Sequence, residues 1–275
     1  MTQSFDILSQ NAFKKIFNKQ RFLFIFSSLC CFGFVFAVFL KLCSQVVESF
    51  SLSTLGLGAF FSSFSIVCAS AVIVQALLKQ ESLGESGKIT KAFHKNWKAL
   101  WLSLLVSMPF FIAMVVVSTV IILSVFLSSL PWIGRFFHTL LIFVPYLSAT
   151  TLILLFLGAF VSMFFCMPAL SDQESIDYMK LIRCFQGNVL NQCIGFIIAA
   201  TPLALCSWLA LDSFYLMTHL VGLSEMHTGS FLIEVLVLVV PVALILTPAL
   251  SFFFNFSFDF YLDKQTIEEK VLIKE

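Results

Sequence analysis

Charged side chains are scarce in this sequence of 275 residues. Lysine and arginine together number 16, and aspartate and glutamate 15, so the chain is only 11% charged. Soluble domains carry about 25% charged residues. Hydrophobic residues make up 60% of the chain, and a soluble fold of this size could not bury them all while keeping a polar exterior. The shortage of charge excludes a soluble enzyme, a nucleic-acid-binding protein and a disordered scaffold.

Motifs for catalysis and for metal binding are also missing. The sequence has no H-E-x-x-H, no G-x-S-x-G and no Walker phosphate loop, patterns that hold a metal, a nucleophile or a phosphate at fixed spacing. None of its eight cysteines forms C-x-x-C, so we expect free cysteines that act as packing residues. We therefore expect no enzymatic activity, no cofactor and no metal site.

Long apolar runs are what the sequence has instead. A membrane-spanning helix needs about 20 predominantly apolar residues. The first run is longer than the core of a signal peptide and has no A-x-A cleavage site, so we interpret it as a retained span. We predict an all-α polytopic membrane protein that forms one domain over residues 1–275. Its six spans are predicted at about residues 22–40, 52–78, 99–130, 139–170, 189–211 and 231–261.

The distribution of basic residues predicts the orientation. If the N-terminus is cytoplasmic, the cytoplasmic segments contain 14 of the 16 Lys and Arg residues, in agreement with the positive-inside rule. The outer loops then keep only Lys41 and Arg135. An even number of spans returns the charged tail, residues 262–275, to the same side. We therefore predict the bacterial inner membrane, with both termini in the cytoplasm.

Three stretches that precede alternate spans share a pattern. Residues 13–20, 89–96 and 181–188 align without gaps as apolar-x-basic-x-Phe-x-x-(Gln/Asn). The apolar and Phe positions lie four apart and share one helix face, and basic neighbours suit anionic headgroups. We infer three hairpins, each opened by a short cytoplasmic amphipathic helix, although chance similarity between inner boundaries would give the same pattern. The shared aromatic and amide positions include Phe17, Phe93, Phe185, Asn96 and Asn188, and the repeat units are 10–80, 86–170 and 178–261.

This layout resembles the YciC-like bacterial inner-membrane proteins and the membrane domain attached to some glycerophosphodiester phosphodiesterases. Those families also place a Phe- and Asn-containing amphipathic stretch ahead of alternate spans. The likeness covers nearly the whole chain, but the catalytic domain of the phosphodiesterases is absent from this sequence. The resemblance implies an envelope or lipid-related membrane role without chemistry of its own.

Ionisable groups inside a membrane are the first candidates for function. Glu234 lies three residues inside the sixth predicted span, near its outer end, and is either a transport residue or an interfacial acid. Asp259 lies at the opposite end of that span, where the run 254–261 is typical of an aromatic belt. Deeper polar residues near the cytoplasmic boundary are Gln75, Asn191, Gln192 and Asn255.

Two functions fit these observations. The first is a multi-pass inner-membrane protein without enzymatic activity, in envelope or lipid homeostasis or as a membrane subunit of a complex. Its expected partners are membrane lipids. A protein partner or a second copy of the chain is left open, and no binding of nucleic acid is expected. The alternative is a small transporter or permease component for a solute, with its site between the spans that proline interrupts.

Overall fold

The computed structural model describes residues 5–45, 49–82, 89, 92, 97–128, 143–172, 189–221 and 231–272. This part of the chain contains helices and no strand, which confirms the all-α prediction. In chain order the helices are α1 (Phe5–Lys14), α2 (Lys19–Gln45), α3 (Ser49–Ser82), α5 (Trp97–Ser128), α7 (Val144–Asp172), α9 (Val189–Val221) and α10 (Phe231–Leu272).

Four of the helices are long and apolar enough to cross a membrane. The qualifying segments are Lys19–Val38, Tyr146–Leu170, Leu190–Ser213 and Val235–Lys264, and α5 adds the shorter apolar segment Met108–Ser124. The four long segments coincide with the first, fourth, fifth and sixth predicted spans. They indicate a protein embedded in a membrane, whereas the spans at 52–78 and 99–130 stay predictions.

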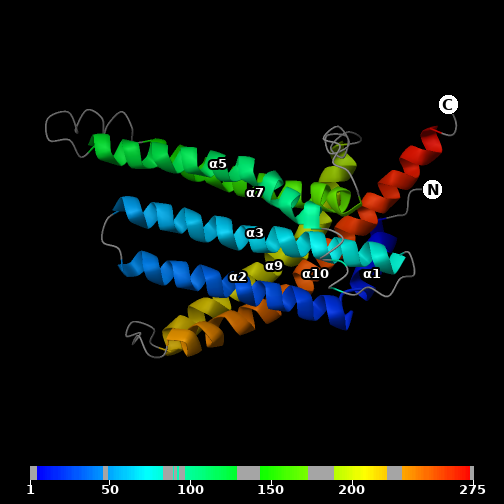
Figure 1. Ribbon diagram of the computed structural model, residues 1–275, viewed down its shortest axis with the longest axis horizontal. Helices are drawn as coiled ribbons and strands as arrows, with labels where there is room; N and C mark the ends of the chain where they lie inside the picture. The colour runs from blue at the N-terminus through cyan, green and yellow to red at the C-terminus, as the bar shows by residue number, and fades with distance from the viewer. Residues whose placement is uncertain are drawn as a thin grey trace.

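The helices form an elongated bundle (Figure 1). The most extensive contacts join α2 to α3, α9 to α10, and α5 to α7. Helix α10 also contacts α1, α2, α3 and α7, so five helices surround it. The two chain ends lie at the same end of the bundle (Figure 1).

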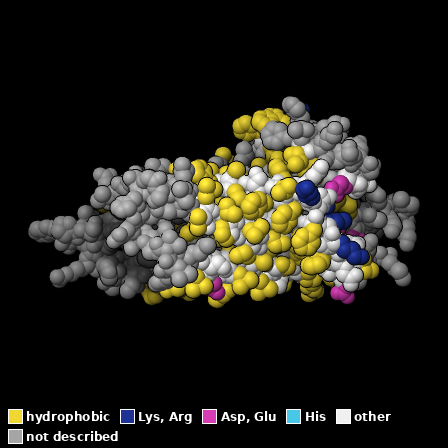
Figure 2. Space-filling model, turned by 90° about the horizontal axis from the view of Figure 1, so that it is seen from below, with side chains coloured by type: hydrophobic (Ala, Val, Ile, Leu, Met, Phe, Trp, Pro, Cys, Tyr) yellow, Lys and Arg dark blue, Asp and Glu magenta, His cyan; other side chains and the backbone are white. Residues whose placement is uncertain are grey.

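The exterior of the bundle is apolar along much of its length. Leucine, isoleucine and valine side chains are exposed on α5, α7, α9 and α10. Figure 2 shows hydrophobic side chains as a broad band on one face of the molecule, with most of the charged groups of that face gathered at one end. Monomeric soluble proteins rarely expose apolar patches beyond a few hundred Å². A band flanked by charge is the surface that a bilayer covers.

The phenylalanines in the middle of α10 are core residues. Phe253, Phe254 and Phe256 are almost fully buried, as is Phe164 of α7. The Phe164 ring packs edge-on against Phe253 at a centroid distance of 5.5 Å. The prediction of a helix over 254–261 is confirmed, but an aromatic belt there is wrong. The reason is that helices contact α10 on several sides, so its consecutive residues are enclosed.

The N-terminal and C-terminal elements differ from the prediction in their boundaries. The pattern at 13–20 does not lie on one helix, because α1 ends at Lys14 and α2 begins at Lys19. Helix α1 is nevertheless amphipathic: Leu8 and Ala12 are buried, whereas the polar Asp6, Gln10 and Lys14 are exposed. At the other end α10 continues to Leu272, so most of the tail predicted from residue 262 extends the last helix.

Candidate functional site

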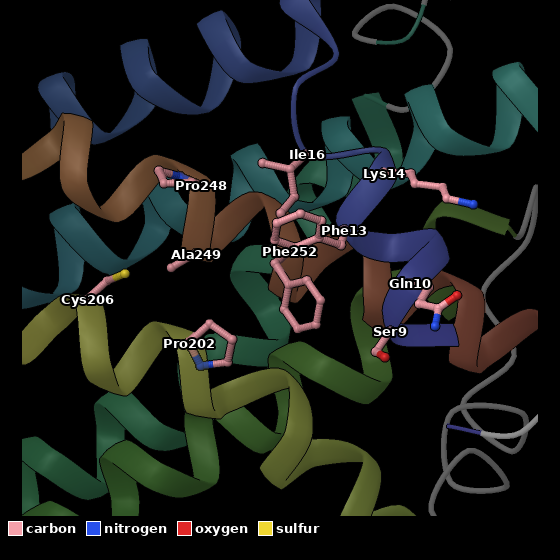
Figure 3. A pocket seen from close by; sticks show the side chains of 10 residues that line it. All are labelled: Ser9, Gln10, Phe13, Lys14, Ile16, Pro202, Cys206, Pro248, Ala249 and Phe252. Carbon is pink, nitrogen blue, oxygen red and sulfur yellow. The ribbon is translucent and has the colours of Figure 1, made fainter. Parts of the chain in front are cut away.

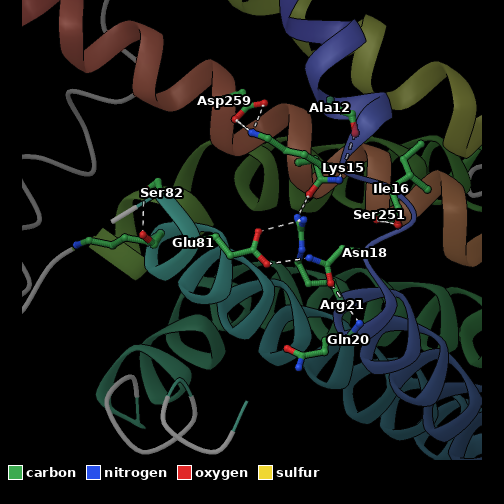
Figure 4. Close-up of polar contacts among 12 residues, drawn as sticks. Ala12, Lys15, Ile16, Asn18, Gln20, Arg21, Glu81, Ser82, Ser251 and Asp259 are labelled. Carbon is green, nitrogen blue, oxygen red and sulfur yellow. Dashed lines mark hydrogen bonds and ion pairs between the residues drawn. The ribbon is translucent and has the colours of Figure 1, made fainter. Parts of the chain in front are cut away.

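A buried arginine joins three helices at the charged end of the bundle. Arg21 lies in the first turn of α2 and is only 3% exposed. Its Nη1 donates to Asn255 Oδ1 of α10 at 2.7 Å, and its Nη2 lies 3.2 Å from Glu81 Oε2 of α3. Figure 4 shows Arg21 and Glu81 facing each other. A charge in such a position requires hydrogen-bonded partners, because its desolvation costs several kcal/mol.

The same region fastens the C-terminal end of α1 to α10. The last carbonyl groups of a helix lack partners within the helix. Asn255 Nδ2 donates to the carbonyl of Ala12 at 3.3 Å, and the hydroxyl of Ser251 donates to the carbonyl of Ile16 at 3.4 Å. Lys15 Nζ forms an ion pair with Asp259 at 2.6 Å. We call these contacts, together with those of Arg21, the basal junction.

Two buried atoms of this region have no hydrogen-bond partner among the described residues, Arg21 Nε and Gln75 Oε1. The other amide atom of Gln75, Nε2, donates to the carbonyl of Phe254 at 3.0 Å. An unpaired buried polar atom costs about 1–3 kcal/mol.

A groove with a volume of about 600 Å³ lies beside the basal junction, between α1, α9 and α10. Helix α1 contributes the polar side chains, and α9 and α10 contribute prolines and other apolar side chains (Figure 3). The residues that line it are Ser9, Gln10, Phe13, Lys14, Ile16, Pro202, Cys206, Pro248, Ala249 and Phe252. Its volume lies within the range of about 300–1,000 Å³ that is typical of ligand pockets.

No disulfide joins the cysteines whose side chains the structure describes, which are Cys30, Cys31, Cys68, Cys166, Cys193 and Cys206. Cys68 and Cys166 are buried, as expected of packing residues, whereas Cys31 and Cys193 are exposed. Within the described ranges, no three His, Cys, Asp or Glu side chains converge on a position that could hold a metal ion. The arrangement here is suited to holding an apolar or amphiphilic molecule by its shape.

The structure places two of the predicted site residues. Phe17 lies in the turn between α1 and α2, is 72% exposed and stacks on Phe22 at a centroid distance of 6.4 Å. Glu234 lies in the first turn of α10, and its side chain is outside the described residues. At 1.5 Å per helical residue, Glu234 is roughly 20 Å from Pro248, so it is remote from the groove. Phe93, Asn96, Phe185 and Asn188 lie outside the described residues.

Sequence reasoning missed the central residue of the basal junction. Arg21 counted only as one of the basic residues that set the orientation. Asn255 and Gln75 were noted as deep polar residues, and Asp259 as an acid at a span end, without partners for any of them. The available signal was a polar residue, Asn255, in a run of phenylalanines, because a buried amide needs hydrogen-bonding partners.

Comparison with known proteins finds no family model, no curated protein and no solved structure that matches the chain. The resemblance to YciC-like proteins and to the phosphodiesterase membrane domain therefore rests on the sequence pattern alone.

Proposed function

We propose that the chain crosses the bacterial inner membrane six times, as three hairpins with both termini in the cytoplasm. The pairs with the most extensive contacts, α2 with α3, α5 with α7 and α9 with α10, are the pairs that such hairpins require. The two chain ends lie at one end of the bundle (Figure 1). Most charges on the face seen in Figure 2 gather at one end too. The positive-inside rule makes this end cytoplasmic.

Reporter fusions test this topology. Green fluorescent protein fused after Glu275 should fluoresce, whereas alkaline phosphatase fused there should be inactive. Alkaline phosphatase inserted between residues 131 and 138, in the predicted second outer loop, should be active. The opposite pattern at either site would contradict the six-span orientation.

We further propose that the protein has no enzymatic activity and works in envelope or lipid homeostasis, or as a membrane subunit of a complex, with membrane lipids as its partners. The observation that carries this proposal is the surface at the start of the chain. Phe13 and Phe17 are 61% and 72% exposed, and the exposed side chains of Lys14 and Lys19 lie close to them in the chain. Phenyl rings and ammonium groups combined in this way favour the boundary between acyl chains and anionic headgroups.

Because Lys15 and Asn255 fasten this segment to α10, its position at the interface is fixed relative to the bundle. A segment held in this way transmits its interaction with the membrane surface to the last helix. An independently tethered amphipathic helix would only anchor the chain.

The test combines Phe17→Ser, Phe93→Ser and Phe185→Ser in a bacterial strain that lacks the gene. We expect normal membrane insertion but loss of complementation, read as lipid composition by mass spectrometry and as sensitivity to detergent. The matched control replaces Phe143, Tyr146 and Tyr215, which are exposed aromatic residues of α9 and the start of α7, and should complement. Full complementation by the first triple variant would contradict the proposal.

One observation favours the alternative of a small transporter or permease component. Pro202 and Pro248 lie inside helices, and both line the groove. Proline removes a hydrogen bond from the helix, and interrupted helices line the substrate sites of many transporters. Uptake by proteoliposomes that Glu234→Gln abolishes would support a transporter whose pathway extends along α10 from the groove to Glu234, because Glu234 itself does not line the groove. Absence of uptake across a broad panel of solutes would exclude it.

A further inference from the structure

The groove between α1, α9 and α10 has one apolar side and one polar side. The α9 and α10 side consists of proline rings, a cysteine, an alanine and a phenylalanine, without a charged group. The polar side chains of the lining all come from α1: Ser9, Gln10 and Lys14. Figure 3 shows these three side chains on one side of the groove, across from Pro202, Pro248 and Cys206. A molecule that fits this lining has an apolar tail and a polar, negatively charged head.

We propose that the groove binds one phospholipid with an anionic headgroup, with an acyl chain between α9 and α10 and the phosphate at Lys14. This inference rests on the lipid-related role proposed above and names the ligand for it. The headgroup end lies at the end of the bundle that carries the basal junction, so the lipid comes from the cytoplasmic leaflet.

The charges near the groove favour an anionic headgroup over a neutral one. Lys15 is paired with Asp259 and Arg21 with Glu81. Lys14 is exposed and forms no ion pair with any residue in the described part of the chain. Its ammonium group is therefore available to a phosphate, and one basic residue near a membrane surface contributes about 1 kcal/mol to the binding of anionic lipid.

The surroundings of the groove give an acyl chain direct access from the bilayer. Leu205 and Leu209 of α9 and Leu244 of α10 are each more than half exposed, and they belong to the apolar exterior next to the residues that line the groove. A lipid tail can enter sideways across this surface without passing polar groups. Each methylene group that leaves water for the groove contributes about 0.8 kcal/mol, but a chain that comes from the bilayer gains only the difference in packing. The headgroup contact at Lys14 must therefore supply the selectivity.

The experiment uses the full-length protein in nanodiscs that contain a trace of photoactivatable phosphatidylglycerol with a diazirine in its acyl chain. Crosslinked peptides are located by mass spectrometry. We expect crosslinks to concentrate at residues 202–206 and 248–252 and to exceed those of the matching phosphatidylcholine probe. Lys14→Gln should lower the crosslinking by phosphatidylglycerol about fivefold, whereas Lys98→Gln, a change at another exposed lysine, should not.

A second variant tests the tail site independently of charge. Cys206 is half-buried at the groove, so Cys206→Trp can fill the space without displacing fully buried residues. We expect this variant to lose crosslinks with both probes at residues 248–252. The control is Cys193→Trp on the same helix, where the side chain is exposed and does not line the groove.

Crosslinks spread evenly over the lipid-facing helices, or unchanged by Lys14→Gln and Cys206→Trp, would overturn the binding site. The lipid-related role would still stand after that result if the variant with Phe17, Phe93 and Phe185 replaced loses complementation. Conversely, selective crosslinking together with full complementation by the Phe17, Phe93 and Phe185 variant would retain the site and contradict the proposed role of the interfacial segments.

Discussion

Replacement of Asn255 by leucine should destabilise the bundle by about 2–4 kcal/mol. The side chain is 1% exposed, and it makes two interactions that leucine cannot. The bond from Arg21 at 2.7 Å involves a charged donor and contributes about 1.5–3 kcal/mol. The bond to the carbonyl of Ala12 at 3.3 Å contributes about 0.5–1 kcal/mol. Leucine has the same number of side-chain heavy atoms and the same branching at Cγ as asparagine, so the substitution leaves no cavity.

In the Asn255→Leu variant Arg21 keeps its ion pair with Glu81, and this pair limits the loss of stability. Glu81 still lies 3.2 Å from Arg21, but its side chain is 38% exposed, so water screens that pair and reduces its contribution. Removing both Arg21 and Asn255 should cost less than the sum of the two single losses, because no buried charge is then left unpaired and Glu81, which loses Arg21, is 38% exposed to water. We therefore expect Arg21→Met combined with Asn255→Leu to recover about 2 kcal/mol relative to the sum of the single variants.

The free energy of unfolding can be measured by titration with sodium dodecyl sulfate in mixed micelles, followed by far-ultraviolet circular dichroism. Thr247→Val is the matched control, because Thr247 is buried on the same helix but donates to its own helix, at the carbonyl of Ala243. Its loss should stay at about 0.5–1 kcal/mol. An unchanged stability of Asn255→Leu, or additive losses in the double variant, would refute the role given to the basal junction.

Three further outcomes are expected in the same assay. Asp259→Asn should cost about 0.5–1 kcal/mol, and less at high salt, because Lys15 in this pair is 39% exposed and open to screening; a loss that salt does not reduce would contradict this. Gly33→Ala should cost about 1–3 kcal/mol, because the added Cβ would lie 2.5 Å from Val239 Cγ1, and Val239→Ala should restore most of it; failure of that rescue would exclude the close approach. Phe17→Ser should leave stability within about 0.5 kcal/mol, since the exposed ring touches little of the bundle, and a larger loss would assign Phe17 to the core.

The long apolar runs were sufficient to predict helices, because about 20 apolar residues in a row have no other stable form in lipid. They did not show which faces of the helices turn inward. The run 254–261 illustrates this: every second residue is aromatic, which is compatible with a belt or with a core. Five other helices contact α10 and enclose these phenylalanines in the core. A local sequence pattern does not contain that information.

The basal junction was beyond sequence reasoning for the same reason. Arg21 and Asn255 are 234 residues apart, and each alone has an ordinary explanation, a positive-inside charge and a polar residue near a boundary. The groove was likewise not visible in the sequence, since Lys14, Pro202 and Pro248 come from separate helices. Proline occurs in each of the third to sixth predicted spans, so nothing in the sequence indicated that Pro202 and Pro248 in particular would line one space.

The contacts between the first and last helices impose an order on biosynthesis. Lys15 and Asp259 are separated by 244 residues, so the N-terminal segment must wait for α10 before it can be fastened. At 5–20 residues per second, the ribosome needs roughly 10–50 s to cover that distance. During this time Arg21 lacks its buried amide partner. A chain truncated before α10 would leave Arg21 with Glu81 of α3 as its partner and without Asn255, and its segment 12–16 would keep the backbone carbonyls that the complete protein pairs with α10.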